Sequence, residues 1–143
     1  KEAHNMSKQS FENEELFLKN LARAYTEYDA KYILPFLADD FGYSSFWVTA
    51  PDLTKDEYTT YIVDKLATMK KLNTVNKFFM MYEQGTGKPF LLIGSRTPDG
   101  GLGCFDVKSN PDRKITSLAI MPSSLYRLGY KNKEEFEKFL GSI

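Results

Sequence analysis

The sequence predicts an α+β fold in which three N-terminal helices pack on a mostly antiparallel sheet. Three observations support this prediction. Apolar residues recur at helical spacing through much of the first half of the chain. A single aromatic strand follows the second helical segment. Beyond residue 72, strand-like segments follow one another with only turns between them, which indicates α+β rather than alternating βαβ units.

Two helices are expected before the first strand. Ser10 can cap the first helix. Its apolar stripe comprises Phe17, Leu21, Ala24, Tyr25 and Tyr28. Asp29 is placed to cap a second helix over residues 30–38. Pro35 lacks an N–H, so a kink or a later start is expected there.

A strand and a third helix come next. Residues 40–49 alternate as a strand, which places one set of side chains on a common face: Phe41, Tyr43, Ser45 and Trp47. Thr54 and Glu57 have the spacing of a capping box and open the third helix. The apolar stripe of that helix comprises Tyr58, Tyr61, Ile62, Lys65, Leu66 and Met69.

The rest of the chain predicts four strands and a short helix. The strands are expected at residues 75–83, 88–97, 102–108 and 114–121. Asn132 can cap the C-terminal helix, whose apolar face comprises Phe136, Phe139, Leu140 and Ile143. We expect this face to pack on the domain's own sheet or helices, so truncation after Met121 should destabilise the protein. Residues 11–143 are expected to form a single domain, and the polar residues 1–10 a flexible tail.

Composition excludes several classes of function. The chain has 143 residues, of which 42% are hydrophobic and 27% charged, as in an ordinary globular domain. Nineteen basic residues balance nineteen acidic ones, so no nucleic-acid partner is expected. No apolar run is long enough to span a membrane. The localisation is left open; the chain begins at Lys1, and export is expected only if a signal peptide was removed.

The motifs that could bind a metal or a cofactor, or supply a nucleophile, are better explained by structural roles. Cys104 is the single cysteine and His4 lies in the tail, so no disulfide, zinc cluster, metal or other cofactor is expected. The run at residues 85–88 resembles a phosphate loop, but a strand follows it, which favours a hairpin turn. Asp39 and Asp40 are adjacent strand residues, so their side chains are expected on opposite faces and in a polar structural role.

Asp29 and the run Leu37-Ala38-Asp39-Asp40, followed by the aromatic strand, resemble the front end of the nuclear transport factor 2-like superfamily. This superfamily includes ketosteroid isomerases and SnoaL-like cyclases, and the resemblance covers roughly residues 11–121. It implies a curved sheet, the cystatin-like cone, with a pocket between the sheet and the helices. It also implies a homodimer with part of its interface on the later strands.

The resemblance places the pocket residue by residue. The implied ligand pocket is lined by Leu21, Tyr25, Leu37, Tyr43, Ser45, Trp47, Tyr61, Phe105, Val107 and Leu118. The isomerases' proton donor falls at Leu21 and their general base at Ser45, and neither side chain can perform that role. Their third catalytic residue falls at Phe105. Asp106, one position on, is a possible acid only if a different turn length brings it into the pocket.

We therefore expect a small-molecule-binding domain for an apolar or aromatic ligand, without catalysis. One alternative is an isomerase, dehydratase or cyclase that uses Asp106 and tyrosine hydroxyls. A second alternative is a homo-oligomeric association module. The face shared by Tyr43, Ser45 and Trp47 either packs in the core or looks into the pocket, and the sequence leaves both open.

Overall fold

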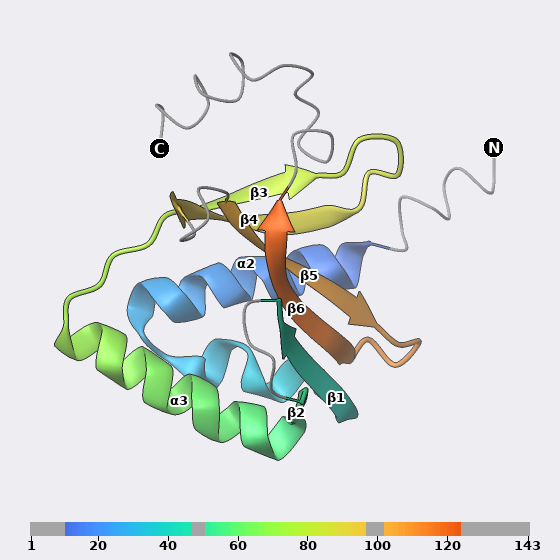
Figure 1. Ribbon diagram of the computed structural model, residues 1–143. Helices are drawn as coiled ribbons and strands as arrows, with labels where there is room; N and C mark the ends of the chain where they lie inside the picture. Colours follow the sequence, from blue (N-terminus) through green and yellow to red (C-terminus); the bar gives the residue numbers. More distant parts are fainter. Residues whose placement is uncertain (1–10, 47–50, 97–101, 124–143) are drawn as a thin grey trace, which may run out of the picture.

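The structure is a computed structural model that describes residues 11–46, 51–96 and 102–123 (Figure 1). Its helical elements are α2 (Glu12–Glu27), the 3₁₀ turns η1 (Ala30–Tyr32) and η2 (Leu34–Phe36), and α3 (Lys55–Lys71). Its strands are β1 (Leu37–Ser45), β2 (Leu53–Thr54), β3 (Phe78–Tyr82), β4 (Pro89–Arg96), β5 (Leu102–Ser109) and β6 (Ile115–Ser123). The predicted α+β class is confirmed, and each predicted late strand is found within a few residues of its expected bounds.

The six strands form one sheet in the order β2-β1-β6-β5-β4-β3. Only β1 and β6 run parallel, and every other neighbouring pair is antiparallel, as predicted. Helix α2 packs on β3, β4 and β5, whereas α3 packs on β1 and β2 (Figure 1). The two helices thus cover different halves of one face of the curved sheet, and the apolar core lies between them and that face.

Helix α2 buries the predicted stripe as far as Tyr25, leaves Tyr28 half-buried at its end, and is joined to the sheet at its first turn. Phe17, Leu21, Ala24 and Tyr25 are all buried in the core. The helix begins after Phe11, which makes no side-chain cap, and Ser10 lies outside the described residues. Glu14 is also buried, and its Oε2 accepts a hydrogen bond of 2.7 Å from the hydroxyl of Ser109 on β5.

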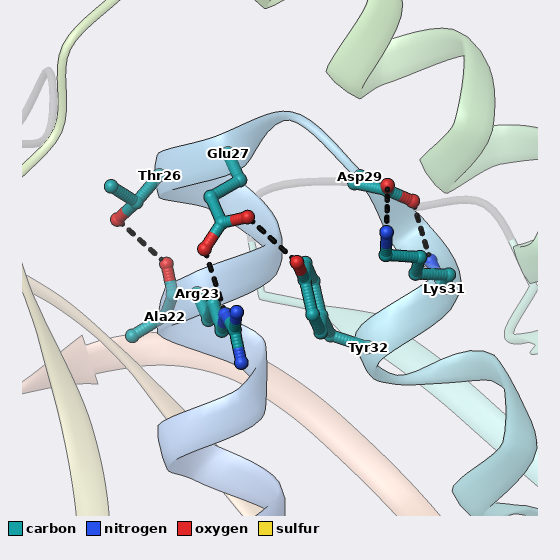
Figure 2. A network of polar contacts seen from close by, with 7 residues as sticks. All are labelled: Ala22, Arg23, Thr26, Glu27, Asp29, Lys31 and Tyr32. Atoms are coloured by element: carbon teal, nitrogen blue, oxygen red, sulfur yellow. Dashed lines mark hydrogen bonds and ion pairs between the residues drawn. The ribbon is translucent and has the colours of Figure 1, made fainter.

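A compact set of polar contacts follows the C-terminal end of α2 (Figure 2). Tyr28 ends the helix in the left-handed conformation at φ 57°. The Glu27 carboxylate accepts hydrogen bonds from Arg23 Nε at 2.7 Å and from the Tyr32 hydroxyl at 2.6 Å. Asp29 accepts the backbone N–H of Lys31 at 3.0 Å, so it caps the next element as predicted. The hydrogen bond from the Lys31 amide is the largest cause that holds the pKa of Asp29 below its usual range, and the Lys31 side chain acts in the same direction.

The expected α-helix over residues 30–38 is wrong. Its place is taken by the two 3₁₀ turns η1 and η2, and Leu37 already belongs to β1. Pro35 lies in the first turn of η2, where its missing N–H costs nothing, but it could not have donated inside an α-helix. The first strand accordingly begins earlier than the predicted 40–49.

Helix α3 confirms the predicted capping box. The Thr54 hydroxyl accepts the Glu57 N–H at 3.3 Å, and the Glu57 carboxylate accepts the Thr54 N–H at 2.9 Å. The expected tail at residues 1–10, Trp47, and the expected C-terminal helix lie outside the described residues.

Candidate functional site

The predicted pocket residues on the strands lie in two adjacent rows across the sheet. In one row, Tyr43 on β1 pairs with Leu118 on β6, which pairs with Val107 on β5. In the next row, Ser45 pairs with Ile120, which pairs with Phe105. Directly paired residues project from the same side of a sheet, so both rows face the helices. The sheet therefore gathers these side chains from three strands that are distant in sequence.

Aromatic side chains from the two helices pack onto these rows. Tyr25 of α2 contacts Phe105, with ring centroids 5.8 Å apart, and Phe78 of β3 at 5.4 Å. Tyr58 of α3 contacts Tyr43 at 4.9 Å and Phe41 at 5.2 Å. Each ring lies tilted on its neighbour, a favourable arrangement for aromatic pairs. We call Tyr25, Tyr43, Tyr58 and Tyr61 the tyrosine cluster.

The hydroxyls of the tyrosine cluster are not equally satisfied. Lys65 Nζ donates to the Tyr61 hydroxyl at 3.0 Å. Tyr58 is only 1% exposed, and its hydroxyl has no hydrogen-bond partner within the described part of the chain. A buried hydroxyl without a partner costs free energy, about 1–3 kcal/mol. The cluster therefore contains a donor whose proton is unused.

Burial sets the protonation state of the tyrosine cluster. Removal from water is the largest cause that raises the pKa of Tyr25, Tyr43 and Tyr58, and the proximity of the other tyrosines raises each further. For Tyr43 the neighbouring Tyr61 hydroxyl is the main contributor after burial. At neutral pH these phenols are protonated, so they can donate hydrogen bonds but cannot act as bases.

Most residues of the expected pocket lie together in the structure. Seven are buried in one cluster: Leu21, Tyr25, Leu37, Tyr43, Phe105, Val107 and Leu118. Tyr61 packs against this cluster, and Ser45 is half-buried beside it in the Phe105 row. Trp47 lies outside the described residues. The sequence analysis missed Tyr58 as a pocket residue, although its place on the α3 stripe beside Tyr61 signalled an inward position.

Asp106 lies on the opposite side of the sheet from the tyrosine cluster. The register between β5 and β6 runs without interruption from Leu102 to Lys108, so side chains alternate strictly through this stretch. Phe105 and Val107 face the helices, so Asp106, paired with Ala119, faces away. The turn at Asn110 does not alter this alternation. The condition under which Asp106 could act as the acid of this site is therefore not met.

A separate surface groove, with a volume of about 400 Å³, contains Asp39 and Asp40. Both side chains are exposed, and both residues line the groove. The β1–β6 register is irregular between Leu37 and Gly42, which interrupts the alternation. Asp39 pairs with Lys55 at 3.5 Å. Across the residues that the structure describes, no group of three acidic, His or Cys side chains is arranged to hold a metal ion.

Comparisons with known proteins identify the fold. No protein-family model matches the sequence, and no curated protein matches it. Among solved structures, a SnoaL-like protein from Burkholderia thailandensis is similar with a TM-score of 0.56 and 19% identity, over 77% of this chain and 93% of that one. A nuclear transport factor 2-like protein from an Exiguobacterium species has a TM-score of 0.51 and 15% identity, over 78% and 98% of the two chains.

A third similar structure is a steroid delta-isomerase from Pseudomonas aeruginosa, with a TM-score of 0.52 and 16% identity over 92% of this chain and 93% of that one. Sequence identities this low indicate a shared architecture alone. None of the helices in the described ranges is long and apolar enough to cross a membrane. The architecture, the sheet order and these similarities together establish that the chain has the nuclear transport factor 2-like fold.

Proposed function

We propose that this protein binds a small apolar or aromatic molecule between the sheet and the helices, without catalysing a reaction on it. The Tyr58 hydroxyl is the observation that carries the proposal. It is a buried donor with no partner in the described part of the chain, whereas the Tyr61 hydroxyl of the same cluster accepts a hydrogen bond from Lys65. A ligand oxygen would accept this proton and remove the cost of leaving it unpaired.

The surroundings of Tyr58 indicate what such a ligand looks like. Phe41, Tyr43 and Tyr25 present ring faces and edges, which suit a flat or hydrophobic body. The Tyr58 hydroxyl suits one hydrogen-bond acceptor, such as a carbonyl oxygen. We therefore propose a mostly apolar ligand with a single acceptor oxygen directed toward Tyr58.

The side chains at the positions of the isomerases' catalytic residues support the proposal that this protein does not catalyse a reaction. Leu21 is fully buried and has no proton to donate, and Ser45 is too weak a base without a partner. Asp106 faces the other side of the sheet. Catalysis nevertheless has one supporting observation, the similarity to a steroid delta-isomerase. We expect no measurable turnover of a β,γ-unsaturated ketosteroid, since loss of a positioned base alone costs about 10²–10⁴-fold. A robust rate would overturn the non-catalytic assignment.

The proposal is tested with paired ligands. A panel of hydrophobic ketones and their hydrocarbon analogues of the same shape is screened by thermal shift against the wild type and Tyr58→Phe. A ketone should stabilise the wild type more than its hydrocarbon analogue does, and this difference should vanish in Tyr58→Phe. If the ketone keeps its advantage in Tyr58→Phe, the hydroxyl is not the recognition group. If no member of the panel binds the wild type, the proposed ligand class is wrong.

A further inference from the structure

The two edges of the sheet differ in a way that bears on association. At one edge, β2 is only two residues long. At the other edge, β3 presents Phe78-Phe79-Met80-Met81-Tyr82, without charge, glycine or proline. Natural proteins blunt exposed edges with short strands, charges or prolines, because an open edge templates pairing with another strand. The β2 edge is blunted by its length, whereas the sequence of β3 contains none of these devices.

The hydrogen-bond pattern shows which backbone groups of β3 point away from the sheet. The N–H of Glu83 donates to Lys88 O at 2.8 Å, so Glu83 is directed toward the β4 side. Orientation alternates along an antiparallel ladder, so Phe79 and Met81 are also directed toward β4. Phe78, Met80 and Tyr82 therefore direct their N–H and C=O groups to the outer edge. Among the described residues, no strand lies beyond β3.

We propose that β3 pairs antiparallel with β3 of a second copy of this chain, about a two-fold axis at Met80. This register places Met80 opposite its own counterpart and Phe78 opposite the partner's Tyr82. All of these positions direct their backbone groups outward, so about six new backbone hydrogen bonds can form. The sheet of each copy continues into the other, and the same patch is used on both sides, as a two-fold interface requires.

Charge complementarity selects a second copy as the occupant. Lys77 and Glu83 flank the apolar strand at equal distances from Met80. In the proposed register each Lys77 lies opposite the partner's Glu83, so the axis generates two attractive cross-strand pairs. The Glu83 Oε1 also accepts a hydrogen bond from Thr86, which keeps this carboxylate at the strand end. A strand that is self-complementary in both charge and backbone pattern fits its own copy best.

Amide hydrogen exchange tests the register directly. The N–H groups of Phe79 and Met81 should exchange slowly at every protein concentration, because they bond β4. The N–H groups of Phe78, Met80 and Tyr82 should become protected only as the protein concentration rises. Over the same concentrations, light scattering should show the mass increasing from 16.4 kDa toward that of the dimer. A monomer up to near-millimolar concentration, or a dimer that leaves these three amides unprotected, would overturn the proposal. A dimer formed through the sheet face would leave these three amides unprotected and would therefore also overturn the proposal.

Charge reversal gives an independent test that leaves the strand's apolar residues intact. Lys77→Glu places Glu opposite Glu at both ends, Glu83→Lys places Lys opposite Lys, and each should weaken dimerisation about fivefold or more. An equimolar mixture of the two variants restores both attractive pairs, so heterodimers should form with affinity near that of the wild type. Lys71→Glu, an equal change of charge on exposed α3, is the matched control and should have no effect. If the mixture does not recover, the register centred on Met80 is wrong.

Discussion

Tyr58→Phe is expected to stabilise the ligand-free protein. The substitution removes only the hydroxyl, and the ring keeps its contacts with Phe41 and Tyr43 in a position that is 1% exposed. An unsatisfied buried hydroxyl costs about 1–3 kcal/mol, so its removal should raise the free energy of unfolding by an amount in that range. For a domain of this size, each kcal/mol corresponds to roughly 4 °C in the midpoint, so an increase of about 4–12 °C is expected.

Tyr61→Phe is the matched control. It removes a hydroxyl from the same cluster, but this hydroxyl accepts a hydrogen bond from Lys65 Nζ at 3.0 Å. Its loss should lower the free energy of unfolding by about 0.5–1.5 kcal/mol. Both variants are measured by calorimetry and by denaturant titration at neutral pH. If Tyr58→Phe is destabilised as much as Tyr61→Phe, the Tyr58 hydroxyl is satisfied within the protein, and the main support for the ligand proposal is lost.

Three further predictions follow from the structure and the sequence. Burial raises the pKa of Tyr25, Tyr43 and Tyr58, so their contribution to stability is complete below about pH 10, where the unfolded chain begins to ionise, and is lost as pH rises further. The free energy of unfolding should therefore fall as pH rises above about 10; unfolding midpoints measured up to pH 12 that stay level would contradict this. Trp47 is expected to face the pocket, so its emission should change when a hydrophobic ligand binds, and an unchanged spectrum with a ligand of proven affinity would refute that position. Removal of residues 124–143, cut there because β6 extends to Ser123, should lower the melting temperature and increase binding of a hydrophobic dye, whereas an unchanged melt and dye response would make this segment a passive tail.

The fold was predictable because its main signals are local. The Thr54–Glu57 box marks the start of α3 from four consecutive residues, and turn residues separate the late strands. The segment after Asp29 was misassigned because its apolar spacing fits a helix as well as two 3₁₀ turns. Pro35 and the pairing of Leu37 with Ile115 favour the two 3₁₀ turns over the helix. That pairing joins residues far apart in the sequence, so a local pattern does not reveal it.

The sequence predicted which residues form the site better than it predicted their hydrogen bonds. Seven of the expected residues form one buried cluster, because the α2 stripe directs Leu21 and Tyr25 inward and alternation along β5 directs Phe105 and Val107 inward. The unpartnered state of Tyr58 depends on where three other tyrosines from α2, β1 and α3 place their hydroxyls, which no local pattern specifies. The groove that Asp39 and Asp40 line also takes in Lys55 of α3 and Asn110 between β5 and β6, a combination that no local pattern specifies.

The pairing of β1 with β6 has a consequence for how the chain is made. During synthesis the N-terminal part emerges first, so α2, β1 and α3 leave the ribosome long before β6. Because β6 lies between β1 and β5, the two halves of the sheet have no strand to join them until that late segment arrives. Contacts between distant segments slow folding, since the loop must close before the contact forms. Nascent chains that end before Ile115 should therefore be exposed to proteases and chaperones, and cooperative folding should appear only after the last strand is released.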